Sequence, residues 1–122
     1  MSEEPSAMQK EPSAIQKPSE LDQALTRLEA TLRSVDLWNT ACPDSEAFDS
    51  SEPFCLDTMT MPQWLRYVFI ARLRALVDAQ QSLPATCQVA PAAEAYLQHA
   101  KPSTRLLVVE AIADVDRIVT QA

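Results

Sequence analysis

Apolar residues recur at helical spacing along most of the chain, and the densest stretch covers residues 61–77. When its residues are set at intervals of about 100°, the apolar arc covers more than half of the circumference, whereas a surface helix needs a stripe of roughly 100°. Thr60 and Gln63 have the spacing of a capping box, and Pro62 suits the first helical position because its missing N–H has no partner there. We therefore predict a central helix that the other segments surround on nearly every side.

Two arginines, Arg66 and Arg72, fall inside this apolar arc. One interpretation is that their aliphatic stems lie along the core while the guanidinium groups reach water. The other is that one of them pairs in the interior with a carboxylate, for which Asp57 is the nearest candidate. The pattern leaves both interpretations open.

Three further helices are expected, over residues 19–38, 90–99 and 104–120. Ser19 and Ser103 are candidate caps for the first and the last of them. The first helix has the alternating spacing that is typical of a bundle seam, at Leu21, Leu25, Leu28, Leu32 and Val35. The last helix has an apolar arc made of Leu107, Val108, Ala111, Ile112, Val115, Ile118 and Val119. Because no strand pattern occurs between them, these helices predict an all-α fold, an up-and-down four-helix bundle.

The segments outside the helices differ in character. Residues 1–18 contain a tandem repeat rich in Pro, Ser, Glu, Gln and Lys, which buries little apolar surface and predicts a disordered tail before a helical domain of residues 19–122. Residues 39–59 form a long loop between the first two helices, with one short turn expected near residues 45–48. Phe48, Phe54 and Leu56 are the candidates for pinning this loop to the bundle.

The composition of the chain mainly excludes classes of function. The chain has 122 residues, 10 Lys and Arg against 17 Asp and Glu, a net charge of −7 and no glycine. An acidic chain lacks the basic surface of a nucleic-acid binder, so we expect no direct nucleic-acid contact. Without glycine, neither a Walker loop nor a dinucleotide fingerprint can form, because both need backbone conformations that only glycine allows.

The residues that carry metal or catalytic chemistry are sparse. The acidic residues between positions 44 and 52 do not have EF-hand spacing, and the glycine of its tight turn is missing. His99 is the only histidine, so no two-histidine metal site can be built. Cys42, Cys55 and Cys87 are widely spaced, which is typical of reduced thiols in a cytoplasmic protein. We expect no metal, no cofactor and no catalytic site, and the hydrophilic N-terminus and short apolar runs predict a cytoplasmic protein without a membrane span.

The irregular segment before the central helix is the candidate binding surface. It joins aromatic and methionine side chains to acidic residues, a composition suited to a protein-binding patch. The candidate interaction residues are Phe54, Asp57, Thr58, Met59, Trp64, Ala90 and Pro91. The alternative is that these aromatics complete the core, which is the commonest fate of such residues.

Several short motifs follow one another along the chain: Phe48-x-Ser50, Pro53-Phe54, Asp57-Thr58-Met59, Trp64-Leu65, Leu83-Pro84 and Val89-Ala90-Pro91. Over residues 20–120 they resemble the YqcC-like family of small bacterial proteins. The resemblance implies an up-and-down four-helix bundle and a biochemical function that is not established.

Chains of this family often carry the label tRNA pseudouridine synthase C. The enzymes of that name resemble one another in an Arg-Leu-Asp motif that carries the catalytic aspartate. Here Leu-Asp occurs at Leu21-Asp22 and Leu56-Asp57, and neither pair is preceded by arginine. We therefore expect a non-enzymatic protein-interaction module, with an accessory protein bound to a tRNA-modifying enzyme as the alternative. The sequence does not indicate an oligomeric state.

Overall fold

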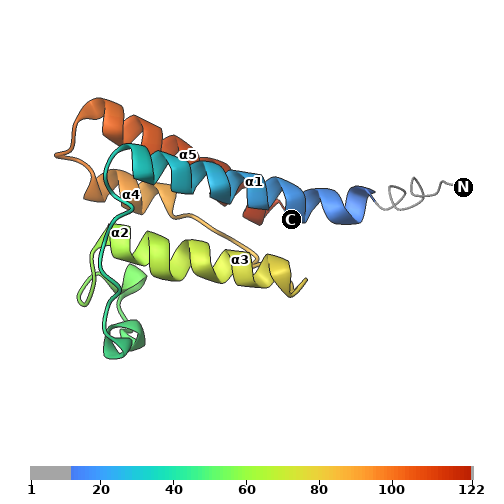
Figure 1. Cartoon of the computed structure of the whole chain (residues 1–122), viewed down its shortest axis with the longest axis horizontal. Helices are drawn as coiled ribbons and strands as arrows, with labels where there is room; N and C mark the ends of the chain where they lie inside the picture. Colours follow the sequence, from blue (N-terminus) through green and yellow to red (C-terminus); the bar gives the residue numbers. More distant parts are fainter. Residues whose placement is uncertain (1–11, 122) are drawn as a thin grey trace, which may run out of the picture.

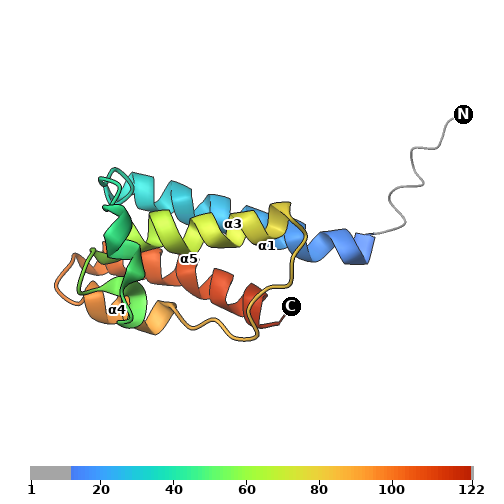
Figure 2. The same cartoon turned by 90° about the horizontal axis from the view of Figure 1, so that it is seen from below.

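The computed structural model describes the backbone of residues 12–121 and the side chains from Glu20 onward. Within this part of the chain all regular elements are helical and no strand occurs, which confirms the all-α fold. The helices are α1 (Pro12–Ser34), a continuous helix of residues 61–78, α4 (Ala90–Tyr96) and α5 (Pro102–Thr120). Consecutive helices run in opposite directions along the long axis of the molecule (Figure 1 and Figure 2).

The helix of residues 61–78 has three parts, α2 (Met61–Trp64), η4 (Leu65–Ile70) and α3 (Ala71–Asp78). Its start is the predicted capping box: the Gln63 N–H donates to Thr60 Oγ1 at 3.3 Å, and the Thr60 N–H donates to Gln63 Oε1 at 2.9 Å. The middle part, η4, is a π-helix. The apolar pattern did not predict this π-turn, because the run is apolar on so many sides that it fits either helical period.

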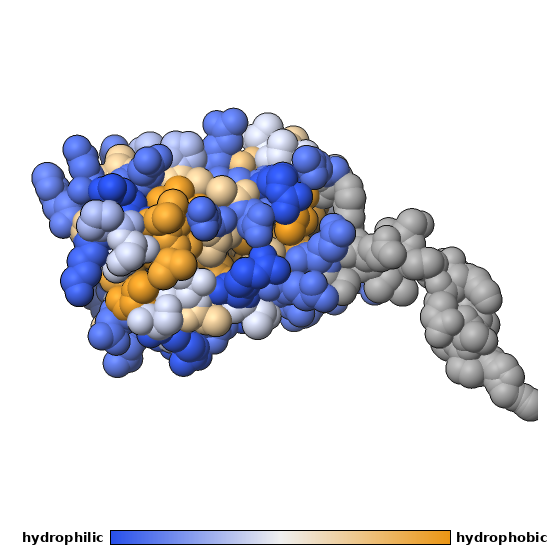
Figure 3. Space-filling model, turned by 90° about the horizontal axis from the view of Figure 1, so that it is seen from above, coloured by the Kyte–Doolittle hydropathy of each residue, from blue (hydrophilic) through white to orange (hydrophobic). Residues whose placement is uncertain are grey.

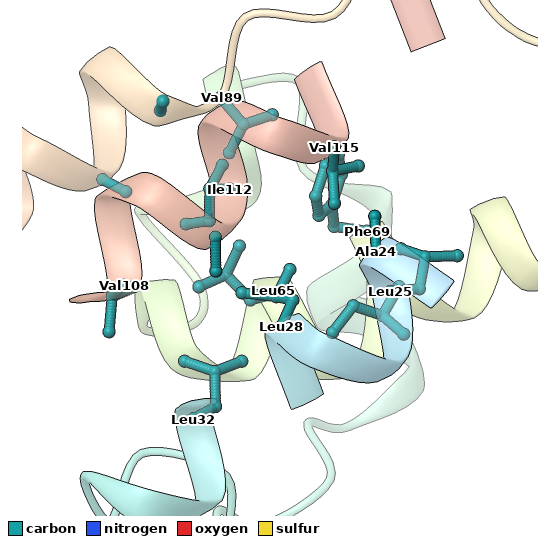
Figure 4. Packing of buried hydrophobic residues seen from close by; sticks show 14 of the residues in the cluster. Ala24, Leu25, Leu28, Leu32, Leu65, Phe69, Val89, Val108, Ile112 and Val115 are labelled. Atoms are coloured by element: carbon teal, nitrogen blue, oxygen red, sulfur yellow. The ribbon is translucent and has the colours of Figure 1, made fainter. Parts of the chain in front are cut away.

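The interface between α1 and α5 is the best-buried part of the molecule. The predicted seam is confirmed at Leu21, Leu25, Leu28 and Leu32, which are all fully buried. Val35 is only partly buried, because α1 ends at Ser34 and not at residue 38 as predicted. Figure 4 shows the seam residues Leu25, Leu28 and Leu32 of α1 facing Val108, Ile112 and Val115 of α5. Leu65 of the central helix and Val89, just before α4, lie nearby. The prediction for Leu107 is wrong: this side chain is 50% exposed, because it lies at the edge of the apolar arc of α5.

The helix of residues 61–78 is not surrounded as predicted. Its buried residues are Met61, Leu65, Phe69, Ile70 and Leu73. Its outer side is open, with Ala71, Arg72 and Ala75 exposed and Trp64, Val68, Leu76 and Val77 only partly covered. The helix therefore packs through one face only. The most extensive contact between two helices of the fold is the one between α1 and α5. Small and charged residues on the outer side of α3 leave no continuous apolar surface there that needs a cover.

Two helix starts differ from the expectation. α1 begins at Pro12 rather than Ser19, so the predicted disordered tail is helical from Pro12 onward, and residues 1–11 lie outside the described residues. α5 begins at Pro102, whose missing N–H suits the first turn, so Ser103 lies inside the helix and does not cap it.

Arg66 and Arg72 have different environments. Arg66 Nη1 donates to the Trp38 carbonyl oxygen at 2.7 Å, and its guanidinium lies over the rings of Trp38 and Tyr67 at 4.6 and 4.9 Å. A carbonyl and two aromatic faces occupy the guanidinium of Arg66, so the second interpretation, a pair with Asp57, does not hold. Arg72 is exposed, as the interpretation with a solvated guanidinium predicts.

The long connection of residues 39–59 contains η2 (Ser45–Asp49) and η3 (Pro53–Cys55), which confirms the turn predicted near residues 45–48. Only one of the three predicted anchors packs against the core, namely Phe54. Phe48 is 39% exposed and Leu56 is 43% exposed. Besides Phe54, hydrogen bonds from the central helix hold the beginning of the connection: Gln63 Nε2 donates to the Ala41 carbonyl at 2.9 Å, and the Tyr67 hydroxyl donates to the Thr40 carbonyl at 2.8 Å.

Candidate functional site

A shallow apolar groove of about 250 Å³ lies between the helix of residues 61–78 and the segment that precedes α4, which runs back from the end of α3 to α4 (Figure 1). Its apolar lining consists of Phe54, Trp64, Val68, Phe69, Leu73, Pro84, Cys87 and Val89. The remaining lining residues are Arg72, Thr86 and Gln88. Among the residues that the structure describes, Arg72 is thus the only charged one that borders this groove.

One wall of the groove is a chain of three aromatic rings. Phe54 meets Trp64 edge-on, with ring centroids 5.0 Å apart, and Trp64 stacks on Phe69 at 5.4 Å. Trp64 and Phe69 are five positions apart, and such residues do not share a face in an α-helix, where positions three and four apart are neighbours. A π-helix is closed by hydrogen bonds between residues five apart, which brings these two side chains onto one face. The π-turn η4 therefore builds the aromatic wall.

The opposite wall is held by a carboxylate from α5. Asp116 Oδ2 accepts hydrogen bonds from the N–H groups of Val89 and Ala90, both at 2.8 Å, and Oδ1 accepts one from Cys87 Sγ at 3.2 Å. Thr120 Oγ1 accepts another from the Cys87 N–H at 3.1 Å. The first N–H groups of a helix have no partner within it and favour negative charge. Asp116 therefore caps α4 from a distant part of the chain and fixes this wall.

The thiol in this wall is held in its protonated form. Burial, followed by the hydrogen bond to Asp116 and its negative charge, raises the pKa of Cys87 to about 12. A thiol that stays protonated at neutral pH is a poor nucleophile and a poor metal ligand. The single histidine, His99, is exposed beyond the end of α4. Cys87 shapes the groove and supplies no reactive group.

The predicted interaction residues do not form one continuous surface. Phe54 and Trp64 line the groove together. Met59 and Ala90 are only 6% and 8% exposed, so they belong to the interior and offer no surface to a partner. Pro91 is exposed, but it borders a different hollow on the side of α4.

Asp57 and Thr58, the other two predicted residues, are exposed but serve the connection itself. Asp57 Oδ1 accepts a hydrogen bond from Ser50 Oγ. Thr58 Oγ1 donates to the carbonyl of Ala47 at 2.7 Å and lies within 3.1 Å of the carbonyl of Cys55. These bonds hold η2 and η3 together beside the groove.

The sequence did not indicate three of the residues that form or hold the groove: Phe69, Arg72 and Asp116. The five-residue separation of Trp64 and Phe69 would place both rings on one face if a π-turn were assumed, and this is the signal that points to Phe69. Asp116 has no local signal, because the groups that it binds lie 26 to 29 positions away in the chain. In the part of the chain that the structure describes, no cluster of three His, Cys, Asp or Glu side chains could hold a metal ion. No helix described there is long and apolar enough to cross a membrane.

The fold and the groove define the class of protein: a small all-α domain whose central helix and α4 segment frame an apolar groove. Within that class, the chain belongs to the family DUF446, described as "tRNA pseudouridine synthase C", whose sequence profile matches residues 20–118. The biochemical function of this YqcC-like family is uncharacterised.

Two uncharacterised relatives and one solved structure cover most of the chain. A protein of Haemophilus influenzae is 36% identical over 89 residues, which are 73% of this chain and 84% of that protein. The uncharacterised protein YqcC of Escherichia coli is 38% identical over 86 residues, 70% of this chain and 79% of its own. The solution NMR structure of that YqcC protein matches with a TM-score of 0.75 and 33% identity, covering 85% and 88% of the two chains. The predicted YqcC-like resemblance is confirmed.

A third relative is much longer. The protein named tRNA pseudouridine synthase C of Pectobacterium carotovorum is 42% identical over 66 residues, which are 54% of this chain but only 18% of that protein. A segment like this domain thus forms a small part of a longer polypeptide.

Proposed function

We propose that this domain is a non-enzymatic protein-interaction module of the bacterial cytoplasm, which receives side chains of a partner polypeptide in the groove beside Phe54 and Trp64. The observation that carries the proposal is the aromatic wall, whose rings of Phe54 and Trp64 are only partly buried where they border the groove. Aromatic residues concentrate at protein interfaces, because each covers a large apolar area with few rotatable bonds.

Catalysis has little support as the function of this domain. An enzyme needs an arranged set of reactive groups around a cleft. The groove offers the protonated thiol of Cys87 and the guanidinium of Arg72. The carboxylate beside the thiol, Asp116, already accepts hydrogen bonds from the N–H groups of Val89 and Ala90, and burial and this carboxylate together raise the pKa of the thiol. The chain also lacks the Arg-Leu-Asp motif expected of a pseudouridine synthase.

A second function, accessory to a tRNA pseudouridine synthase, is favoured by the longer relative. In that protein a segment similar to this domain is covalently part of a chain named tRNA pseudouridine synthase C. Covalent linkage keeps two domains at high effective concentration. A separate chain with the same task has to bind its enzyme through a surface, and the groove is the candidate surface. The net charge of −7 favours a protein contact over one with tRNA.

The test is affinity capture with three tagged forms of the domain, namely wild type, Trp64→Ala and Leu106→Ala. Leu106 is 58% exposed and outside the groove lining, so its variant is the matched control for loss of apolar surface. Val68→Gln is a second groove variant that leaves the aromatic rings in place. We expect the captured partner to rebind, as a purified protein, to wild type and Leu106→Ala and to be lost with both groove variants. Equal binding by all folded forms would refute a docking role for the groove.

The same set of proteins tests the second function. Size-exclusion chromatography of the wild-type domain mixed with the pseudouridine synthase of the same organism should give a joint peak that Trp64→Ala abolishes. Pseudouridine formation by the isolated domain would instead overturn the non-enzymatic proposal.

A further inference from the structure

Arg72 is exceptional among the arginines of the described residues. Six others donate hydrogen bonds to a carboxylate or a carbonyl: Arg27, Arg33, Arg66, Arg74, Arg105 and Arg117. Arg105 donates to the carbonyl of Gln98 at 3.2 Å. Arg72 has no hydrogen bond, ion pair or ring contact within residues 20–121, and it is the arginine that borders the apolar groove. Its guanidinium is therefore free for a group that comes from outside.

The surroundings of Arg72 favour a carboxylate as that group. A guanidinium presents its donors in a planar fork that matches the two oxygens of a carboxylate. No Asp or Glu of the described residues belongs to the groove lining, although the chain as a whole carries a charge of −7. The carboxylate of Asp116 lies behind the opposite wall, where it accepts hydrogen bonds from Cys87, Val89 and Ala90. The apolar walls beside Arg72 exclude water from one side of the pair, which strengthens its attraction.

The size of the groove limits the rest of the ligand. A cavity of roughly 150 Å³ is large enough to hold benzene. A groove of about 250 Å³ therefore has room for one aromatic or long aliphatic side chain and too little room for a whole helix. The aromatic wall of Trp64 and Phe69 gives such a side chain a flat surface to pack against.

We propose that the groove binds a segment of a partner protein in which one large apolar side chain stands next to an Asp or Glu. The apolar side chain fills the space between Trp64 and Val89, and the carboxylate pairs with Arg72. This inference rests on the proposed function, since it names the kind of segment that the interaction module recognises. It also explains why a strongly acidic domain keeps one unpaired arginine beside its groove.

The test uses a phage-displayed library of random peptides selected on immobilised wild-type domain, Arg72→Gln, Arg72→Glu and Lys101→Gln. Lys101 is exposed and outside the groove lining, so Lys101→Gln removes one positive charge elsewhere and is the matched control. Arg72 is exposed, so its variants keep the fold, which circular dichroism verifies. Affinities of an enriched peptide and its Glu→Gln analogue are then measured by fluorescence anisotropy at low and high salt.

We expect wild type and Lys101→Gln to enrich peptides with a large apolar residue beside Asp or Glu. The Glu→Gln analogue and the Arg72→Gln variant should each bind about fivefold more weakly, the size of a partly exposed ion pair. This difference should shrink in high salt. Arg72→Glu should select Lys or Arg in the acidic position.

Two results overturn the inference and have different consequences for the proposed function. Enrichment of apolar peptides without any acidic preference, lost in Val68→Gln, would show that the groove docks proteins but that Arg72 does not select a carboxylate. Failure to enrich any peptide that depends on Val68 would reject the inference and the docking groove together.

Discussion

The interface between α1 and α5 and the groove beside α3 are built from similar apolar residues, but they differ in burial. In the interface, Leu25, Leu28 and Ile112 are fully buried, and neighbouring residues follow the regular spacing of an α-helix. In the groove, Trp64 and Val68 stay partly exposed beside a π-turn. Figure 3, which views the molecule from above, shows that apolar residues also reach this surface, where several of them form a band flanked by hydrophilic residues.

This difference in burial shows which part of the fold leaves apolar surface available for binding. A regular seam pairs every apolar residue with a partner from the facing helix, so nothing in it remains for a ligand. The π-turn rotates Trp64 and Phe69 onto the same face, so the helix presents more aromatic surface than the chain covers. Stability should therefore depend mainly on the seam, and binding mainly on the groove.

The largest expected effect is at the seam, where Leu28→Ala should lower the free energy of unfolding by about 3 kcal/mol. Leu28 is fully buried between α1 and α5, so truncation leaves a cavity as well as removing apolar area. Leu107→Ala is the control, because that side chain is 50% exposed, and it should change stability by less than about 0.5 kcal/mol. Urea denaturation measures both. Equal costs for the two variants would contradict the assignment of the core to this seam.

The next effect concerns the wall of the groove that Asp116 holds. Asp116→Ala should lower the free energy of unfolding by about 2 kcal/mol. The substitution leaves the N–H groups of Val89 and Ala90 without their partner at the start of α4. It should also lower the pKa of Cys87 from about 12, while burial keeps it above the ordinary 9.0. The pH dependence of alkylation, measured in a Cys42→Ser background that also carries Cys55→Ser, reports this change. An unaltered alkylation profile would show that Asp116 does not contact the thiol in solution.

The same thiol makes stability depend on pH in the alkaline range. The pKa of Cys87 is raised in the folded state, so its contribution to stability is complete below the ordinary pKa of 9.0 and is lost as pH rises towards 12. Wild type should therefore lose more stability over this range than Cys87→Ala does. Thermal denaturation of the two proteins across the range measures the difference, and parallel curves would contradict the raised pKa.

The two regions also differ in how far the sequence predicts them. The leucine spacing of α1 and the capping box at Thr60 and Gln63 are local patterns, so the seam and the helix start were predictable. The groove depends on the hydrogen-bonding period inside η4 and on the contact of Asp116 with a segment distant in the chain. Neither is encoded in local periodicity. Phe54 and Trp64 were predicted as site residues by their composition alone, together with residues that the structure buries.

A smaller effect is expected where the groove meets the long connection. Phe54→Ala should lower the free energy of unfolding by about 1 kcal/mol, the contribution of an edge-on aromatic pair. Phe54 packs on Trp64 and is the one predicted anchor of residues 39–59 that reaches the core. Leu56→Ala, at a residue that is 43% exposed in the same connection, should cost less. Denaturation monitored by tryptophan fluorescence compares them, and a larger cost for Leu56→Ala would reverse the assignment of the anchor.

The smallest effect should come from the ionic contacts on the outside of the seam. Glu29 accepts hydrogen bonds from Arg33 at 2.7 Å and from Arg74 at 2.9 Å, which joins α1 to α3. These bonds, the one from Arg33 first, lower the pKa of Glu29 below its ordinary 4.5. Because the folded-state pKa is lowered, the stabilisation is present above that ordinary pKa and is lost as pH falls through the folded-state value.

Glu29→Gln should therefore cost only about 0.5 kcal/mol near neutral pH, as surface ion pairs do. The difference from wild type should vanish in acid, where Glu29 itself is protonated, and should shrink in high salt. Urea denaturation at neutral and acidic pH measures it. A cost that persists in acid would contradict this ionic origin, because glutamine keeps the aliphatic stem of glutamate and only the charged group is lost.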